Sequence, residues 1–444
     1  MKIFCKNPFP RIIEPIPLIL IFTISSIFII LFSSFFFIND SLRCQKHITN
    51  NFGYVDSSTN LSHILFGIAG STKTWNNRRH YVELWWKPNH TRCVVWLDKE
   101  PPKDQPWPDT SPPYMVSANT SMLRSITREN VRVEMRLARV VFEMYRLGLE
   151  DNVRWFVLGD DDTVFFPENL VTVLSRYDWQ EMRYVGGVSE SVDMNVVLSY
   201  EMAHGGGGIA VSRPLAAELA RIMDGCLRPH ENLYGSDARL WACVTELGVS
   251  LSKELGFHQM DIRGDASGLL AAHPPAPLVS LHHLDWVSPI DPRIPNRVDS
   301  LSPLLSAYRA DPGRALQQTI CYEKTKNWSV SVSWAYTAHI HPWIVQPWEL
   351  LIPTRTFTTW SNSSDDGPFT FNTRPVGRDP CERPLVYFLD RVEEVEGGPV
   401  VTTSYSRFRP GQECGRAGFR EALKVETVRV VSTKMGRGEW RKVS

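Results

Sequence analysis

The sequence has no excess of charge of either sign, because its 48 Lys and Arg residues balance its 48 Asp and Glu residues. A chain that neutralises a phosphate backbone carries a basic surplus, so the composition argues against a nucleic-acid partner. The sequence also has no CxxC pair or Cys/His spacing of the kind that holds structural zinc, and no internal repeat. With 444 residues, 43% of them hydrophobic, the chain is long enough for two packed domains.

Residues 16–38 contain no charged side chain. This segment is long enough to cross a hydrocarbon core of about 30 Å at about 1.5 Å per residue, and it is longer than the apolar part of a signal peptide. We therefore expect one transmembrane anchor, preceded by a cytosolic tail (residues 1–15) and followed by a polar stem (residues 39–61).

Sequons for N-glycosylation all lie after the expected anchor, at Asn60, Asn89, Asn119, Asn327 and Asn362. Together with a modest excess of basic residues before residue 16, they predict a single-pass type II protein whose folded part lies in the lumen of the Golgi.

Cysteines after the anchor would lie in an oxidising compartment. We expect the pairs Cys226–Cys243 and Cys381–Cys414, because the members of each pair are close in the sequence. The cysteine pattern by itself leaves other pairings open.

Residues 62–295 alternate short apolar runs with helical patterns. Strands are predicted at 63–69, 93–98, 153–158, 183–187 and 278–281, and helices at 76–86, 128–147, 167–177, 213–223 and 237–247, the last capped by Ser236. Such alternation is typical of an α/β domain with a sheet between two layers of helices. Residues 296–444 lack this alternation, and the period-two pattern at 328–334 predicts a mainly β C-terminal region.

Three consecutive carboxylates, Asp160, Asp161 and Asp162, follow the apolar run 153–158. Such a run at the end of a buried strand needs a cation beside it, and a divalent metal that also binds phosphate oxygens fulfils this need. An EF-hand loop is excluded, because Phe165 and Val171 stand where it requires Gly and Glu. A phosphatase of the haloacid dehalogenase type stays open as an alternative, since Asp160, Asp162 and Val164 match its first motif, although its later acidic motif is missing.

A resemblance to a known family rests on several motifs in order. These are WFVLGDDDTVF, YVGG, HGGGGIAVSR, the segment from Cys226 to Cys243 that contains Asp237, and LHHLD. Over about residues 62–292 the chain resembles the Fringe-like glycosyltransferases of the β-1,3-galactosyl/N-acetylglucosaminyl type, and it is most similar to their plant branch.

The resemblance implies a GT-A fold, that is, a Rossmann-like mixed sheet with helices on both faces. It also implies inverting transfer of a hexose from a UDP-sugar to a glycan or glycoprotein acceptor, with Mn²⁺ or Mg²⁺ as cofactor. Asp162 matches the family's metal ligand, with Asp160 beside it, and His283, or else His282, completes the metal site.

The same resemblance assigns further residues. Asp237 takes the position of the catalytic base, although Ser236 replaces the family's neighbouring acidic residue and an Asp at a helix start also serves as a helix dipole partner. Donor binding is assigned to Asp160 and Asp161, to the glycine run through Gly206 and Gly207, and more loosely to Gly70, Ser71 and Arg79. A lumenal binding protein that has kept the fold and lost the activity is the second alternative.

Overall fold

A computed structural model describes the chain from residue 58 onward with short gaps. The described residues are 58–118, 136–147, 152–230, 232–360, 367–394, 398–409, 414–436 and 440. From Thr59 on they belong to one compact unit. No helix within these ranges is both apolar enough and long enough to cross a membrane, and the expected tail, anchor and stem up to residue 57 lie outside them.

A seven-stranded mixed sheet forms the centre of the N-terminal part, in the order β3-β2-β1-β4-β7-β6-β8. Its strands are β1 (Ile64–Ala69), β2 (Arg92–Leu97), β3 (Tyr114–Val116), β4 (Trp155–Asp160), β6 (Tyr184–Gly186), β7 (Ile209–Ser212) and β8 (Leu251–Lys253). The pairs from β3 to β4 are parallel, β7 is antiparallel to both neighbours, and β8 is parallel to β6. Parallel neighbours place their carboxyl ends at one edge, so β1, β2 and β4 end together.

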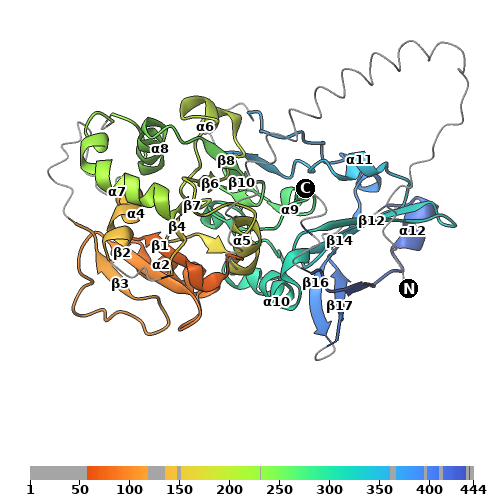
Figure 1. The fold of residues 1–444 in the computed structure, drawn as a ribbon. Helices are drawn as coiled ribbons and strands as arrows, with labels where there is room; N and C mark the ends of the chain where they lie inside the picture. The colour runs from red at the N-terminus through yellow and green to blue at the C-terminus, as the bar shows by residue number, and fades with distance from the viewer. Residues whose placement is uncertain are drawn as a thin grey trace, which may run out of the picture. The chain divides into compact units, whose positions relative to one another are not determined.

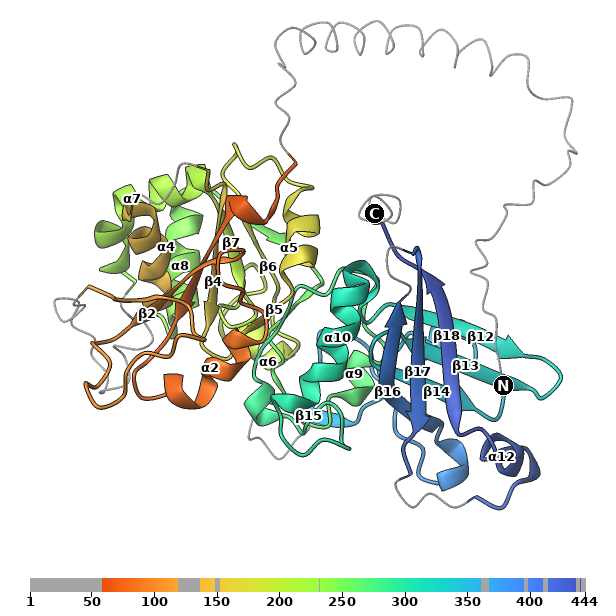
Figure 2. The same ribbon diagram turned by 90° about the horizontal axis from the view of Figure 1, so that it is seen from below.

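Helices cover both faces of this sheet (Figures 1 and 2). One face packs against α4 (Arg136–Arg146), α7 (Arg213–Leu227) and α8 (Ser236–Glu246), and the other against α2 (Trp75–Glu83) and α5 (Pro167–Leu174). The strands are buried on both sides, as the apolar runs of the sequence predict. This mixed α/β arrangement is consistent with a GT-A-like fold.

The predicted elements recur with shifted bounds. The helix expected at 128–147 is described from Arg136 to Arg146, and its earlier residues lie outside the described ranges. The predicted cap of α8 is wrong, because Ser236 is the first helical residue and Gly235, at φ 80°, is the cap without a side-chain hydrogen bond. A positive φ is a conformation that glycine adopts without strain, which explains why Gly235 precedes this helix.

A small three-stranded sheet, in the order β5-β11-β9, lies next to the end of β4. Its strands are β5 (Val164–Phe165), β9 (Phe257–His258) and β11 (Ser280–Leu281). Antiparallel pairing of Leu281 with Val164 brings the residues after β11 beside the acidic run that precedes β5. Segments far apart in the sequence therefore meet at the carboxyl end of β4.

The C-terminal part contains a six-stranded antiparallel sheet, as the prediction of a mainly β region requires. Its strands, in spatial order, are β12 (Gln318–Glu323), β13 (Trp328–Ser333), β14 (Thr337–His341), β16 (Leu385–Glu394), β17 (Val400–Arg407) and β18 (Thr427–Thr433). The helices α10 (Ser302–Ala310), α11 (Pro347–Leu350) and α12 (Ala417–Ala422) accompany it. Shorter elements link the parts, namely α6 (Val192–Val197), α9 (Ser267–Leu270) and the antiparallel pair β10 (Ile262–Gly264) and β15 (Phe357–Thr359).

Strand β13 alternates in sequence but is buried throughout. Its apolar residues enter the hydrophobic core, and its serines bond to segments that cover the opposite face. Ser333 donates to the carbonyl of Leu270 at 2.9 Å, and Ser329 donates to the carbonyl of Trp343 at 3.1 Å. Both faces of this alternating strand are therefore buried, because other segments cover its serine face and accept the serine hydrogen bonds.

One continuous hydrophobic core extends from the α2 and α5 face of the mixed sheet into the six-stranded sheet. Polar contacts cross the same boundary, since the Asn169 side chain donates to the carbonyl of Pro312 at 2.9 Å and the backbone N–H of Glu168 donates to the Tyr308 hydroxyl at 2.9 Å. Both expected disulfides are present, Cys226–Cys243 and Cys381–Cys414.

Candidate functional site

The acidic run lies at the carboxyl end of β4, where Asp160 is the last strand residue. The side chain of Asp160 is 38% exposed, whereas that of Asp162 is 1% exposed. Asp161 is buried and accepts hydrogen bonds from Thr74 and Arg78 of the α2 region. The three carboxylates thus point in different directions, and Asp160 and Asp162 are the two that share a site.

His282, which follows β11, completes this site. Its Nε2 atom lies 3.1 Å from an oxygen of Asp162 and 3.7 Å from an oxygen of Asp160. One ligand atom from each of these three residues lies within 4.8 Å of the others, which is the spacing of a set that can hold one metal ion.

The carboxylates of the site and the His282 imidazole shift one another's pKa values. Burial would lower the pKa of His282, but Asp162 and Asp160 raise it to about 9. Burial would raise the pKa of Asp162, but His282 and Arg78 hold it below its usual range. Although 38% of the Asp160 side chain is exposed, its partial burial and the neighbouring carboxylates raise its pKa above the usual value, and His282 opposes this shift. An ionised Asp162 therefore depends on positive charge beside it.

Asp162 also has unused hydrogen-bonding capacity. Both of its carboxylate oxygens are buried and, within the described residues, lie at ion-pair distance from His282 and Arg78 without a well-aligned hydrogen bond. A buried carboxylate without such a bond is costly, and a divalent cation would remove that cost. The residues present therefore fit a metal ion held by Asp160, Asp162 and His282.

The ring of His283 faces a different neighbour. Its Nδ1 atom lies 3.1 Å from Asp261, and the ring stacks on Trp360 at a centroid distance of 4.1 Å. The sequence ranked His283 before His282 as a metal ligand, whereas it is the ring of His282 that faces the carboxylates. His283 has φ 52°, a left-handed turn that directs the two adjacent rings to different partners.

The glycine run 205–208 packs against His282. A Cβ atom added to Gly206 would lie 2.1–2.4 Å from three atoms of the His282 ring, and one added to Gly207 would lie 3.1 Å from the backbone of Gln259. The carbonyl of Gly206 accepts a hydrogen bond from Thr163 at 2.8 Å. The glycines that the resemblance assigns to donor binding thus leave room for the His282 ring beside the acidic site.

Replacing Gly206 with alanine should displace the His282 ring from Asp162. We expect Mn²⁺ affinity to fall about 10- to 100-fold, the range found when the support of a metal ligand is lost. Titration calorimetry of the full-length chain with Mn²⁺ measures this. Gly225→Ala is the control, because a Cβ there has no other atom within 4 Å. Equal Mn²⁺ affinity in both variants would remove His282 from the ligand set.

Asp237 lies in the first turn of α8 and is half-buried. Its carboxylate accepts hydrogen bonds from the backbone N–H groups of Gly205 and Ala238, both at 3.1 Å. Its charge also contributes to the raised pKa of Asp160. The glycine run therefore connects Asp237 with His282, so two residues that the resemblance assigns to one active site lie at the same loop.

Arg78, rather than the predicted Arg79, lies at the acidic site. Its guanidinium is 3.1 Å from Asp161, 3.4 Å from Asp162 and 3.2 Å from Asp285. Arg79 instead bonds to Glu83 at 2.6 Å, one helical turn later. The sequence contains a signal for this difference, since the spacing of Arg79 and Glu83 is that of an ion pair along one helix.

Replacing Arg78 with methionine should leave three carboxylates without their shared cation. We expect the free energy of unfolding to fall by about 2 kcal/mol without divalent metal, and to recover partly when Mn²⁺ is added. Arg79→Met is the matched control, with an expected loss of about 0.5 kcal/mol. Urea denaturation with and without Mn²⁺ provides the comparison. If Mn²⁺ raised the free energy of unfolding of both variants equally, Arg78 and the metal would not share a site, and the prediction would be wrong.

Gly70 and Ser71 follow β1, whose last residue Ala69 pairs with Asp160. They therefore lie at the sheet edge that carries the acidic site. The Ser71 side chain accepts from the backbone N–H of Lys73 at 3.2 Å, which fixes the turn into α2. The structure brings these two residues to the predicted edge and directs Arg79 elsewhere.

Sequence reasoning missed an aromatic wall beside the site. Trp286 is 47% exposed, and its ring lies 5.0 Å from that of Trp360, which also stacks on His283. The guanidinium of Arg263 lies over both tryptophans. Trp360 comes from the C-terminal part, so no local motif could have placed it here.

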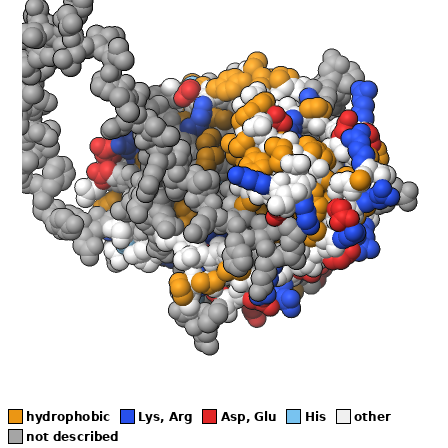
Figure 3. Space-filling model, turned by 90° about the vertical axis from the view of Figure 1, so that its right-hand side faces the viewer, with side chains coloured by type: hydrophobic (Ala, Val, Ile, Leu, Met, Phe, Trp, Pro, Cys, Tyr) orange, Lys and Arg blue, Asp and Glu red, His pale blue; other side chains and the backbone are white. Residues whose placement is uncertain are grey.

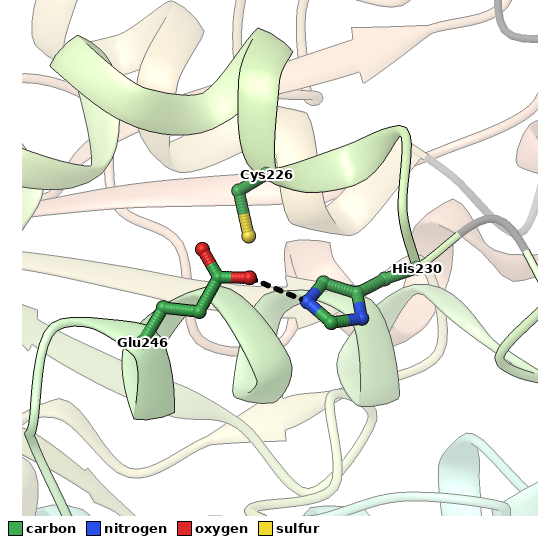
Figure 4. Close-up of side chains that lie close together, drawn as sticks. All are labelled: Cys226, His230 and Glu246. Atoms are coloured by element: carbon green, nitrogen blue, oxygen red, sulfur yellow. Dashed lines mark hydrogen bonds and ion pairs between the residues drawn. The ribbon is translucent and has the colours of Figure 1, made fainter.

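A second group of possible metal ligands does not form a site. Figure 4 shows Cys226, His230 and Glu246 close together, with His230 and Glu246 bonded at 2.7 Å. The sulfur of Cys226 is bonded to Cys243, so it offers no thiolate. This group is an ion pair beside a disulfide.

The mixed sheet carries carboxylates and an imidazole at the end of its central parallel strand. Residues 59–267 match the Fringe-like family, and this match points to a glycosyltransferase. Residues 194–444, more than half of the chain, match the family described as "Protein of unknown function, DUF604", and the chain belongs to that family. No curated protein matches the chain. The resemblance to the Fringe-like family is thus confirmed for most of the predicted α/β part.

Proposed function

We propose that the protein is a metal-dependent inverting glycosyltransferase that moves a hexose from a UDP-sugar to a glycan or glycoprotein acceptor. The observation that supports it best is the convergence of Asp160, Asp162 and His282 around buried carboxylate oxygens that lack a well-aligned hydrogen bond within the described residues. Fringe-like glycosyltransferases generally use UDP-sugars, and the Fringe-like match covers all of these residues except His282. Membership of the plant branch remains part of the proposal.

The metal would be held by Asp160, Asp162 and His282. When bound, a divalent cation supplies positive charge to the diphosphate oxygens as the nucleotide departs. A mixed imidazole and carboxylate ligand set suits Mn²⁺ better than Mg²⁺, which prefers oxygen ligands alone. Arg78 lies 3.1 Å from Asp161 and 3.4 Å from Asp162, and after His282 it is the next charge that lowers the pKa of Asp162.

Asp237 would act as the base. In the transfer, the acceptor hydroxyl oxygen forms a bond to the anomeric carbon, and the bond from that carbon to the UDP oxygen breaks with its electron pair. The acceptor proton passes to the Asp237 carboxylate. Asp237 is half-buried and held by the backbone N–H of Gly205, so it is both accessible and oriented.

Exposed sequons support the proposed Golgi lumen and type II topology. Asn60, Asn89 and Asn327 are exposed, while Asn119 and Asn362 lie outside the described residues. The lumenal location is tested by the glycosylation of these three exposed sites in the expressed chain. Glycosidase treatment should then lower the mass of the chain.

One experiment tests the proposed activity. The full-length chain is incubated with a panel of UDP-sugars and mixed glycan acceptors, and free UDP is measured with EDTA and after addition of excess Mn²⁺. We expect UDP release with one donor, loss in EDTA and recovery with Mn²⁺. Phosphate release without any UDP would instead indicate the phosphatase alternative. Binding of UDP without turnover would indicate a binding protein.

A further inference from the structure

A cavity of about 510 Å³ lies in the C-terminal part, and none of its lining residues belongs to the acidic site. This volume is within the range of about 300–1,000 Å³ that is usual for small-molecule sites. Its walls come from the end of β14 and the loop after it, from α11, from the stretch around Arg374, and from the segments joined by Cys381 and Cys414. The polar and aromatic lining residues are His341, Trp343, Glu349, Arg374, Glu382 and Arg416.

The walls of this cavity are fixed from several sides. The disulfide Cys381–Cys414 ties the segment that carries Glu382 to the start of α12. The hydroxyl of Ser329 donates to the carbonyl of Trp343 at 3.1 Å and accepts from the N–H of Val345 at 2.8 Å. These bonds hold the loop after β14, and the Trp343 ring lies edge-to-face with the His341 ring at a centroid distance of 5.3 Å.

Arg374 is also anchored through its backbone and its Nε group. Its backbone N–H donates to the carbonyl of Pro353 at 2.9 Å, and its Nε–H donates to the carbonyl of Ile352 at 3.0 Å. The outer guanidinium nitrogens make no hydrogen bond within the described part of the chain. They are therefore available to a ligand, and the rest of the side chain is already in position.

His341 supplies an independent sign of a missing partner. It lines the cavity, is 1% exposed, and neither of its ring nitrogens has a hydrogen-bond partner among the described residues. Burial, together with His339 and Arg374, holds its pKa well below the usual value. It is therefore a neutral imidazole with one donor and one acceptor, which matches a hydroxyl group that can both accept and donate.

The charges of the lining indicate a neutral ligand. Arg374 and Arg416 line the cavity together with Glu349 and Glu382, and Arg416 also pairs with Asp379 at 3.1 Å, so an anion would meet carboxylates and a cation would meet guanidinium groups. Sugar hydroxyls bond to both kinds of group, and the face of Trp343 offers an apolar surface to the C–H groups of a sugar ring. On the part of this side of the molecule that is coloured in Figure 3, charged side chains of both signs lie among hydrophobic ones.

We propose that this cavity is a second carbohydrate site, which binds a neutral sugar unit of a glycan. The sugar hydroxyls bond to His341, Arg374 and Glu349, and the ring packs on Trp343. Binding itself requires no catalysis. The use that we propose for the cavity does rest on the proposed function: the cavity would hold one part of a glycan acceptor while another part of the same acceptor reaches the acidic site.

The test fills the cavity at Gly418. A Cβ atom there would have only the carbonyl oxygen of Pro342 within 4 Å, at 3.8 Å, so a leucine side chain can extend into open space. The full-length wild-type chain is applied to an array of neutral oligosaccharides and their sulfated and sialylated forms, and the best neutral binder is titrated by calorimetry. We expect Gly418→Leu to weaken this binding at least tenfold and the matched Gly418→Ala to change it less than twofold.

Trp343→Ala provides a second variant with the same expected loss, and thermal unfolding shows that each variant is folded. Wild-type affinity in both Gly418→Leu and Trp343→Ala would overturn the proposal, as would binding of only the charged glycans or of sulfate alone. Asp162→Asn should bind the neutral glycan normally. A wild-type chain that binds it through this cavity but releases no UDP with any donor would refute the transferase and leave the carbohydrate site standing.

Discussion

Asp162→Asn is expected to lower the rate of UDP release from a UDP-sugar about a thousandfold. The carboxylate is buried between His282 and Arg78, and its oxygens have no well-aligned hydrogen bond among the described residues. An amide keeps the shape but loses the charge that holds a metal ion. If the metal contributes about 4 kcal/mol to the stabilisation of the departing diphosphate, its loss corresponds to about three powers of ten in rate.

The measurement is the rate of UDP release as a function of Mn²⁺ concentration. The control is Asp178→Asn, whose carboxylate is exposed and, among the residues that the structure describes, accepts only from the N–H of Gln180. Asp178→Asn should behave as wild type. Asp162→Asn should stay folded, as thermal unfolding would show. Undiminished turnover of Asp162→Asn at low Mn²⁺ would exclude Asp162 as a metal ligand.

Asp237→Asn is expected to reduce transfer about 100- to 10,000-fold and to leave UDP binding unchanged. This is the usual contribution of a general base. An asparagine retains an oxygen that can accept from the backbone N–H of Gly205, so the loop and the start of α8 should stay in place. The substitution therefore separates a base from a residue that only stabilises the helix.

Two readouts decide between these roles. A base predicts a lower kcat with an unchanged Kd for UDP, and a helix-stabilising residue predicts a lower melting temperature with a normal kcat. Asp299→Asn is a suitable control, because Asp299 lies in the first turn of a short helix far along the chain. If the kcat of Asp237→Asn were normal, the base would have to be another group. Glu231 would be the next candidate, and it lies outside the described residues.

Local patterns predicted much of the α/β part. The apolar runs that became β1, β2 and β4 are buried on both faces, and a buried strand is recognisable from its composition alone. The acidic run directly after such a strand also marked the site, because clustered carboxylates at a strand end require a cation. The two expected disulfides were confirmed, although proximity in sequence was their only support.

Other features depend on contacts that no local pattern contains. The period-two pattern of 328–334 predicted β structure, but it did not reveal that the loop after β14 and the α9 region cover the serine face of β13. The core of the mixed sheet continues into the C-terminal sheet, and Trp360 from that part stacks on His283. These contacts join residues distant in the chain, so only the folded structure reveals them.

The sequence by itself predicted the position of the candidate site, because a buried strand followed by Asp160, Asp161 and Asp162 places three carboxylates at one strand end. The tertiary structure decided which side chains share the site. Pairing of β11 with β5 brings LHHLD to the carboxylates, and the left-handed backbone at His283 leaves His282 facing Asp162. Likewise, the face that α2 presents to the sheet edge selects Arg78 over Arg79. Neighbouring residues in sequence point in different directions once the backbone is folded, and that direction is set by packing.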